Sequence, residues 1–246
     1  SVSWRDKLSN GLGYGATLVM SDAMSTILSY PNETNNISKY YRGRKLGEIW
    51  GYETNGLAKT DEEMKSHLAS LPNGGQNALG TNWAAGDIMY KDLNGDGKID
   101  GGQGVLGNTG DRKVIGNETP RYNFGLTLNA EYKGFDLSAY FTGAARTSTF
   151  FEDRTFWPFA SGMGFFNVFK EIYDNRWTPE TAGAAKYPVV TDGFNVQSMR
   201  RSTVWQKDAS YLRLKNLNIG YDLPMAILRP LGITHAQVFA NATNLF

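Results

Sequence analysis

Hydrophobic and polar residues alternate along several stretches of the chain, and this alternation predicts β-strands. The clearest run is Tyr122 to Tyr132, in which Tyr, Phe, Leu, Leu, Ala and Tyr occupy every second position and mostly polar residues lie between them. Gly134 follows, and a second alternating run covers Phe135 to Phe141. Because successive side chains of a strand point to opposite faces of a sheet, the two runs predict a hairpin with one apolar and one polar face.

Two further stretches show the same two-residue period. Leu12 to Met20 alternates between larger apolar residues and mostly small ones, and Tyr211 to Tyr221 alternates with a break. In the second stretch the apolar positions change from even numbers at Leu214 to odd numbers at Leu217. One additional residue near Asn216 would return them to a single face, so we predict a β-bulge there.

Other segments are expected to be strands on weaker grounds. The stretch from Lys45 to Gly56 is rich in aromatic residues and is interpreted as extended. A last strand is expected from Ile233 onward, and the residues from Val238 to Phe246 have the pattern of a strand that is still running when the chain stops. We therefore interpret the chain as a piece of a longer protein; the alternative is a natural domain with a strand at its C-terminus.

The sequence also predicts short helices between long loops. Thr60 and Glu63 have the spacing of a capping box, so Thr60 to Leu71 is the best helix candidate. A second short helix is predicted between Phe166 and Trp177. The stretch from Phe150 to Phe165 is expected to be a long loop. Long loops on one side and tight turns on the other are typical of outer-membrane barrels.

Composition limits the class of protein. The chain has 246 residues, 13% aromatic residues and 28 glycines, which favours β structure with many turns. No segment approaches the length of a membrane-spanning helix, but barrel strands need only alternating hydrophobicity. A soluble sandwich shows the same alternation. The aromatic residues at the ends of the predicted hairpin favour a bilayer, where Tyr and Trp lie at the two interfaces.

Charge and residue chemistry exclude several functions. A net charge of +1 gives no reason to expect nucleic acid as a partner, because phosphate binding needs concentrated positive charge. The absence of cysteine removes disulfides and thiolate sites. The only two histidines are far apart, and no catalytic motif is present, so we expect no enzyme. The basic clusters at 42–44 and 200–201 suit a solvated loop as well as an anionic ligand.

The segment 86–112 contains a motif, DLNGDGKID, that fits the beginning of a calcium loop. Ca²⁺ is coordinated by about six to eight oxygen atoms. Asp92, Asn94 and Asp96 would supply side-chain oxygens at the first, third and fifth positions of such a loop. Gly97 would permit the sharp turn at the sixth position. The motif predicts a structural Ca²⁺ site rather than a helix–loop–helix sensor, because no strong helix flanks it.

The second half of the motif fits less well. Lys98 would contribute its backbone carbonyl at the seventh position, and Asp100 would bind directly or through water at the ninth. The twelfth position is Gln103 instead of a bidentate glutamate, which would lower the affinity. Asp111 could replace that carboxylate. The alternative is a turn rich in Asn, Asp and Gly that needs no ion.

Several motifs follow one another along nearly the whole chain: YYRGRKLGEIWGYETNG at 40–56, GDIMYKDLNGDGKID at 86–100, DRKVIGNETPRYNFGLTLNAEYKGFDLSAYFTG at 111–143, RWTPE at 176–180, and ASYLRLKNLNIGYDLP at 209–224 followed by VFANATNLF. In this order and spacing, they resemble the C-terminal part of the SusC/RagA family of TonB-linked outer-membrane transporters of Bacteroidetes-type bacteria. The chain from 1 to 246 is accordingly interpreted as a C-terminal fragment of such a barrel. Its expected fold class is all-β, an antiparallel transmembrane β-barrel segment with long extracellular loops and short helices.

The resemblance implies more than these residues contain. Such transporters have a 22-stranded barrel with an N-terminal plug, are energised through TonB, and pair with a SusD-like surface lipoprotein that covers the barrel. They import glycans, or peptides in some members, across the outer membrane. The plug, the TonB-contacting segment and most strands are expected to belong to other parts of the longer protein. The family typically has a carboxylate late in the calcium loop, and Gln103 departs from that pattern.

On this interpretation, apolar strand faces meet outer-membrane lipid and polar faces meet the lumen. Aromatic residues expected in the outer loops are candidates for stacking on a sugar substrate: Tyr52, Trp83, Trp157 and Trp177. The alternative is a secreted soluble β-module that binds carbohydrate and contains a structural calcium site. An outward-facing apolar band would favour the barrel, and two packed sheets with a buried apolar interior would favour the module.

Overall fold

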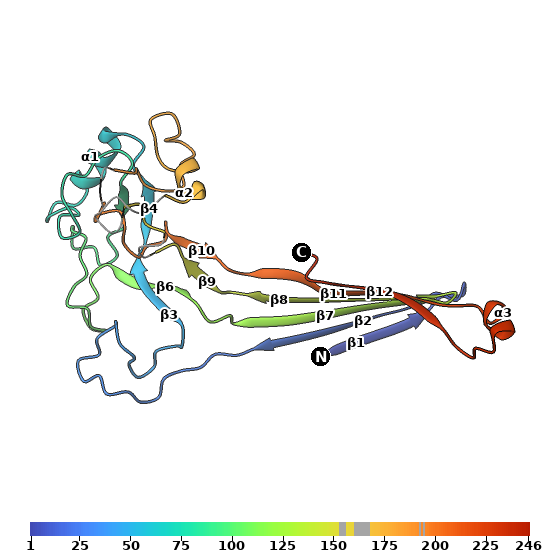
Figure 1. Ribbon diagram of the computed structural model, residues 1–246. Coiled ribbons are helices and arrows are strands. Elements are labelled where there is room, and N and C mark those ends of the chain that lie inside the picture. The colour runs from blue at the N-terminus through green and yellow to red at the C-terminus, as the bar shows by residue number, and fades with distance from the viewer. Residues whose placement is uncertain (153–155, 160–167, 192, 194) are drawn as a thin grey trace. The chain divides into compact units, whose positions relative to one another are not determined.

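The computed structural model describes residues 1–152, 156–159, 168–191, 193 and 195–246, and it contains two compact units (Figure 1). The first unit, which we call the sheet unit, comprises 1–24, 120–147 and 209–246. The second, which we call the loop unit, comprises 25–119 and 148–208. Each unit is thus assembled from segments that are distant in sequence.

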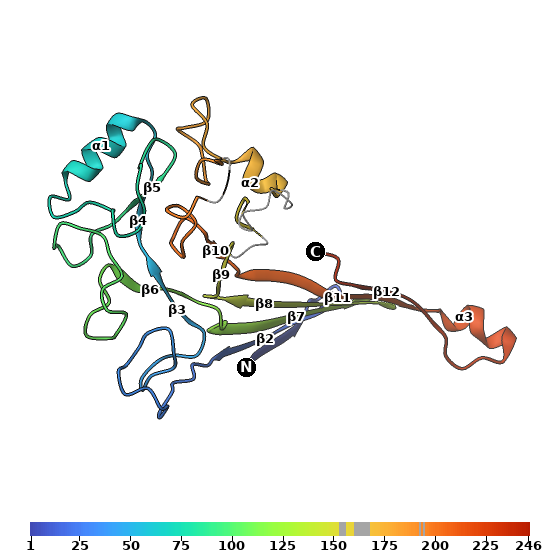
Figure 2. The same ribbon diagram turned by 60° about the vertical axis from the view of Figure 1, so that its left-hand side comes forward.

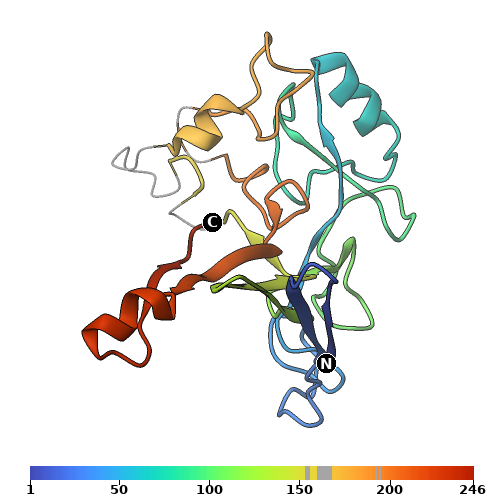
Figure 3. The same ribbon diagram turned by 90° about the vertical axis from the view of Figure 1, so that its right-hand side faces the viewer.

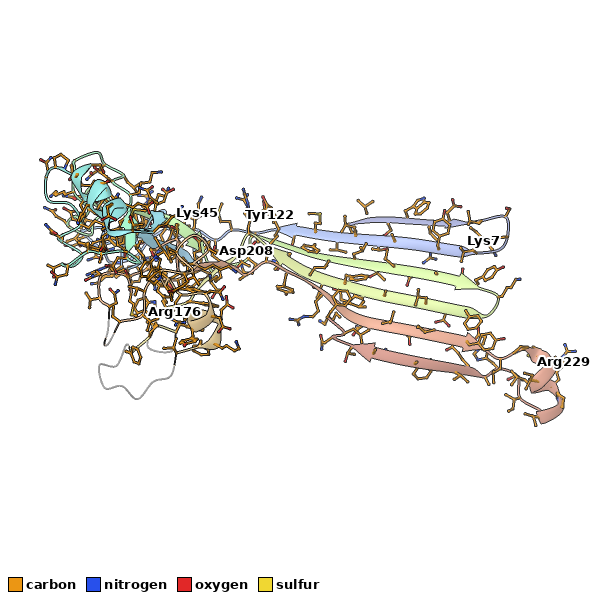
Figure 4. The ribbon with its side chains drawn as sticks, turned by 90° about the horizontal axis from the view of Figure 1, so that it is seen from above. Lys7, Lys45, Tyr122, Arg176, Asp208 and Arg229 are labelled. Atoms are coloured by element: carbon orange, nitrogen blue, oxygen red, sulfur yellow. The ribbon has the colours of Figure 1, made fainter. Side chains whose placement is uncertain are left out.

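The sheet unit is built on one six-stranded antiparallel sheet, whose strands lie side by side in Figure 4. In spatial order, the strands are β1 (Val2–Lys7), β2 (Gly13–Asp22), β7 (Tyr122–Tyr132), β8 (Phe135–Ala145), β11 (Tyr211–Asp222) and β12 (Gln237–Thr243). The predicted hairpin is therefore β7 and β8. The sheet is open, with β1 and β12 at its two edges, and the termini lie on these edge strands or just beyond them (Figure 3).

The strand register places apolar side chains from all six strands on one face of the sheet. Leu18 lies opposite Leu126, Leu128 opposite Ala139, and Ile219 opposite Leu137. Between Leu214 and Asn216 the register of β11 against β8 shifts, which confirms the predicted bulge. The members of this apolar face include Val2, Trp4, Leu18, Met20, Leu126, Leu128, Leu137, Phe141, Leu214, Ile219 and Val238.

The opposite face is mainly polar, and the apolar face is accessible. Thr127 pairs with Thr17 and Tyr140 on the polar face. On the apolar face, Met20 is 62% exposed and Val238 is also 62% exposed. In a sandwich, such a face would be buried against a second sheet. The exposed apolar face agrees instead with a partial transmembrane barrel, in which lipid covers it.

Connections at the two ends of the strands differ in length. At one end, β7 and β8 are joined by Lys133 and Gly134, which both have positive φ, and β11 and β12 are joined through α3 (Met225–Leu228) and the 3-10 turn η1 (Arg229–Leu231), drawn in Figure 2. From the other end, the chain leaves β2 to enter 25–119 and leaves β8 to enter 148–208. The connections at the first end are thus shorter than the excursions at the other, which is the pattern expected for this class of barrel.

The loop unit contains short elements around its own hydrophobic core. The elements are β3 (Glu48–Tyr52), β4 (Thr54–Leu57), α1 (Asp61–Ala69), β5 (Ile88–Tyr90), β6 (Arg112–Asn117), β9 (Ser148–Phe150), α2 (Lys170–Asp174) and β10 (Gln206–Asp208). In the described part of this unit, three two-stranded sheets pair β3 with β6, β4 with β5, and β9 with β10. The core centres on Tyr52, Ile88, Tyr90, Tyr187 and Trp205.

The helix predictions agree with the structure in kind, with shorter bounds. Thr60 caps α1 and accepts a hydrogen bond from the Glu63 backbone N–H at 3.2 Å. The Glu63 carboxylate in turn accepts from the backbone N–H of Lys59 at 2.6 Å. α2 falls within the predicted 166–177 range but covers only Lys170–Asp174. Part of that range, like most of the loop predicted from Phe150 to Phe165, lies outside the described residues.

Two strand predictions at the chain ends need correction. β12 begins at Gln237 rather than Ile233, because the preceding residues return from η1, and it ends at Thr243 rather than continuing to Phe246. Asn244 has a positive φ of 53°, which interrupts the regular strand, although the backbone of 244–246 still forms hydrogen bonds with Leu214 and Lys215 of β11. β1 was not predicted at all. No helix in the described ranges has both the length and the apolar character needed to cross a bilayer.

Candidate functional site

The acidic loop at 92–100 folds by hydrogen bonds from its own backbone to its carboxylate and amide side chains. The two oxygens of Asp92 accept from the Gly95 and Gly97 N–H groups at 2.7 and 2.9 Å. Both glycines have positive φ, 74° and 77°, a conformation that costs them little. Asn94 Oδ1 accepts from the backbone N–H of Asp96 at 3.0 Å. The predicted first, third and fifth positions thus belong to one tight turn.

A buried carboxylate from outside the motif contacts this loop. Asp111 is fully buried, and its two oxygens accept from the backbone N–H groups of Leu93 and Asp100, both at 2.8 Å. Burial raises the pKa of Asp111, and the nearby charge of Asp92 acts in the same direction. Gln103 is exposed, and its backbone N–H donates to Asn108. Asp111, rather than Gln103, is therefore the later side chain that contacts the loop.

The second half of the loop carries an ion pair. Lys98 Nζ lies 2.8 Å from Asp100 Oδ2, and this contact lowers the pKa of Asp100 and raises that of Lys98. The backbone N–H of Lys98 donates a hydrogen bond to Asp96 Oδ1, so the Lys98 backbone is part of the same turn. Among the residues that the structure describes, no group of three or more His, Cys, Asp or Glu side chains is arranged as a metal site.

The four candidate stacking residues pack against other parts of the loop unit. Tyr52 lies in β3, not in a loop, and its ring is 5.4 Å from that of Tyr90 in an edge-on contact. Trp83 approaches Tyr90 at 6.2 Å, also edge-on. Trp157 lies 6.3 Å from Trp205. All these residues belong to the hydrophobic core or lie against it.

Trp177, the fourth candidate, packs against the chain at Gly86. A Cβ atom at Gly86 would lie 2.8 Å from the Trp177 ring, and Gly86 has a φ of +84°, so glycine suits this position on both grounds. Trp177 is half-buried. The structure thus uses all four aromatic side chains for packing, and only Tyr52 also lines the cavity described next.

The loop unit contains a polar cavity of about 420 Å³, which we call the arginine cavity. It lies beside β3 and the beginning of β6, and the segment at Arg200 and Arg201 lines it next to the bridge between Ser202 and Tyr52. Gly51 permits this close approach, because a Cβ there would lie 2.7 Å from the Arg201 carbonyl oxygen. The lining residues are Ile37, Ser38, Arg44, Trp50, Gly51, Tyr52, Arg112, Arg200 and Arg201.

Three of the four arginines are held by backbone carbonyls instead of carboxylates. Arg44 donates to the carbonyls of Ile37, Lys39 and Glu48 at 2.6–3.0 Å. Arg112 donates to Gly101 at 2.5 Å, and Arg200 donates to Leu79 at 2.6 Å. A neutral carbonyl orients a guanidinium without cancelling its charge. These contacts therefore fix the three side chains and leave their positive charges in place.

Among the described residues, only the fourth arginine of the cavity forms an ion pair. Arg201 forms a two-point ion pair with Glu152, at 2.7 and 2.5 Å. Within the described residues, Arg44, Arg112 and Arg200 form no ion pair, and the Nε atom of each is buried without a hydrogen-bond partner. The cavity is therefore positively charged and can attract an anion.

Tyr52 connects this cavity to the core. Burial raises the pKa of its hydroxyl, while Arg112 and Arg200 act in the opposite direction because their positive charges favour the phenolate. Sequence reasoning treated 42–44 and 200–201 as two separate basic clusters, suited to a solvated loop as well as to an anionic ligand, and did not single out Arg112. Their convergence depends on contacts between distant segments, and no local spacing could have indicated it.

Comparison with known proteins finds relatives of one kind. Two TonB-dependent receptors of Formosa agariphila are similar in sequence: receptor P3 is 28% identical over 204 residues, 82% of this chain, and receptor P26 is 31% identical over 163 residues, 65% of this chain. The chain spans only 18% and 15% of their respective lengths. No protein-family profile matches the chain.

Solved structures of a RagAB peptide importer have a similar fold. The closed-closed state aligns with a TM-score of 0.62 at 20% identity, and the open-open state with 0.58 at 18% identity. Each alignment covers 99% of this chain and 24% of the importer chain. At this level of identity, the similarity establishes the fold alone.

Proposed function

We propose, from the premise that this chain resembles a segment of the SusC/RagA-like TonB-dependent transporters, that the whole protein imports nutrients across a Gram-negative outer membrane. Its substrates would be oligosaccharides or peptides, and the energy would come through TonB bound to a part of the protein outside this chain. A SusD-like surface lipoprotein would cover the barrel. We assign it no enzymatic activity, and its relatives are named as receptors and importers.

The observation that carries this proposal is the continuous apolar face of the sheet unit. All six strands contribute to it, and side chains such as Met20 and Leu212 remain more than half exposed. In water, such a surface would favour aggregation, whereas in a bilayer it is the lipid-facing wall. The secreted soluble module is less well supported, because it would need to bury this face.

The experiment tests import by the full-length protein in its native bacterium. A deletion strain complemented with the wild-type gene is given labelled oligosaccharides and labelled peptides, and uptake is compared with and without a functional TonB. Uptake that depends on both the gene and TonB supports the proposal. Wild-type uptake of every offered solute in the deletion strain would contradict it. Extraction of the full-length protein in mild detergent then tests whether a surface lipoprotein co-purifies.

We also propose that the acidic loop binds Ca²⁺ as a structural staple. Asp92, Asn94 and Asp96 supply oxygens within one turn, and Asp111 is a buried carboxylate next to it. A divalent cation would relieve the repulsion between Asp92 and Asp111. The full-length transporter should gain thermal stability in millimolar CaCl₂ but not in NaCl of equal ionic strength. An unchanged melting temperature, together with calcium-free protein by atomic absorption, would contradict the proposal.

A further inference from the structure

We infer that the arginine cavity binds an oxyanion, a carboxylate or sulfate group, carried by the imported solute. The statement that the solute is imported rests on the proposed function. The binding of the anion itself rests on the cavity alone. The cavity lies wholly within the loop unit, so the inference does not depend on how the two units are arranged.

The first argument is charge that lacks an internal partner. Arg44, Arg112 and Arg200 form no direct ion pair among the described residues, although the charge of Arg112 acts on the nearby Asp100 carboxylate. Removing guanidinium groups from water without a bound anion is costly. Elsewhere in the same unit, positive groups are paired in the ordinary way, as Lys113 is with Glu53. Three guanidinium groups without a direct ion pair thus line one cavity.

The second argument is preorganisation. Arg112 and Arg200 each use one terminal nitrogen on a backbone carbonyl, Gly101 and Leu79 respectively, which leaves further N–H groups to donate. Guanidinium groups bind carboxylates and sulfates through charge-assisted hydrogen bonds, often in pairs. Because the protein already restricts these side chains, binding an anion costs less side-chain entropy than it would at a mobile surface arginine.

The third argument is the aromatic part of the wall. Trp50 is half-buried, and its indole N–H donates to Glu48 Oε1 at 2.8 Å and to the Tyr41 hydroxyl at 3.1 Å. The Glu48 carboxylate also accepts a hydrogen bond from the Tyr41 hydroxyl, so the three side chains form one hydrogen-bonded group. An aromatic side chain beside a positive cluster suits a solute with an apolar face and an acidic group. A cavity of about 420 Å³ has room for one such unit, for example a sugar acid.

The test measures anion binding to the purified full-length transporter by isothermal titration calorimetry at fixed ionic strength. The probes are sodium glucuronate, N-acetylaspartate and sodium sulfate, with glucose as the neutral comparison. We expect saturable binding of at least one anion and none of glucose. The anion that binds most tightly indicates which kind of solute carries the oxyanion: a sugar acid, an acidic peptide or a sulfate ester.

Variants then assign the binding to the cavity. Arg112→Gln and Arg200→Gln should each weaken binding about tenfold or more, as expected for the loss of a charge-assisted bond. Arg200→Lys keeps the charge and should weaken it less. Arg42→Gln removes an exposed arginine that does not line the cavity, and it should leave binding unchanged. Near-ultraviolet circular dichroism of each variant checks that the fold is retained.

Two results would overturn the inference: the absence of saturable binding for all three anions, or equal loss of binding in Arg42→Gln and Arg200→Gln. Neither result depends on transport. If the protein binds anions but imports nothing, the proposed function fails and the cavity assignment stands. If it imports solutes but binds no anion, the proposed function stands and the cavity assignment fails.

Discussion

Gly51 is a residue at which the backbone of one segment approaches another closely. A Cβ at this position would lie 2.7 Å from the Arg201 carbonyl oxygen, and backbone cannot move aside as a flexible side chain can. Gly51→Ala should therefore destabilise the loop unit by about 1–3 kcal/mol, as overpacking does elsewhere. Limited proteolysis of the full-length protein in detergent, with cleavage between 25 and 119 followed over time, measures the effect.

Gly183 provides the matched control for this prediction. It lies in the same unit, and a Cβ there would meet no atom within 4 Å. Gly183→Ala should leave the proteolysis rate unchanged or slow it slightly, because alanine restricts the unfolded chain. Equal effects of the two substitutions would show that the contact between β3 and the 200–205 segment is looser than described.

Glu53 permits a prediction about pH. Its carboxylate bonds to Lys113, with Lys91 also nearby, and these contacts lower its pKa below the ordinary value of 4.5. A carboxyl whose pKa is lowered by folding contributes stability above its unfolded pKa, and the contribution is lost as pH falls through the folded value. The contribution is small because both lysines are exposed to solvent.

Glu53→Gln should therefore lower the thermal stability of the loop unit slightly at pH 7, and the difference from wild type should disappear as the pH falls below about 4.5. Thermal unfolding followed by tryptophan fluorescence across this range measures it. A difference that grows on acidification would mean that the ion pair is absent in solution.

Among the elements, the turn between β7 and β8 sets the hairpin register. Lys133 and Gly134 have φ of 48° and 86°, the combination of a type I′ turn, which matches the twist of the strands. Gly134→Val should impair assembly, because a β-branched residue rarely adopts positive φ. Lys133→Asn should be tolerated, since asparagine is favoured in that conformation.

The amount of heat-modifiable full-length protein in the outer membrane measures both turn variants, because folded barrels and unfolded chains migrate differently on gels. Lys133→Asn is the control, and Lys133→Val is a second test, since it introduces valine at the other turn position. Lys133→Val should be poorly tolerated for the same reason as Gly134→Val. Normal assembly of both valine variants would mean that the turn does not direct pairing of the hairpin.

The elements also show where sequence reasoning works and where it stops. β2, β7, β8 and β11 could be predicted because their alternation is long, and the bulge near Asn216 could be predicted because the parity of leucines changes across it. β1 was missed although Val2 and Trp4 alternate with polar residues, since six residues that end in charged positions carry a weak signal. Local periodicity finds strands, but it weakens as they shorten.

The candidate site was less predictable than the strands. The acidic loop could be recognised because its chemistry lies within nine consecutive positions, whereas the contact with Asp111 was only one of two possibilities before the structure. The arginine cavity could not be predicted. Arg44, Arg112 and Arg200 come from three distant parts of the chain, and only the folding of the loop unit brings them to one place.

At the scale of the whole molecule, the two faces of the sheet make opposite predictions for neighbouring residues. Leu128 is near the middle of β7 on the apolar face, and Thr127 precedes it on the polar face. Leu128→Arg in the full-length protein should cost about 2–4 kcal/mol if it lies near the bilayer midplane. Thr127→Arg should be tolerated, because it would point into the lumen. Surface labelling of intact cells quantifies assembled protein, and equal losses would contradict the assigned faces.

The loop unit has a consequence for protein engineering and for the evolution of specificity. It consists of two sequence segments, 25–119 and 148–208, which are separated by the β7–β8 hairpin. The Tyr52 carbonyl of the first segment accepts a hydrogen bond from the backbone N–H of Thr203 in the second. If one segment were exchanged for that of a relative, the other segment would lose the residues that it packs against. A change of substrate preference by segment exchange would therefore require both segments from the same relative. The two segments form one structural and evolutionary unit, although they are separate in the coding sequence.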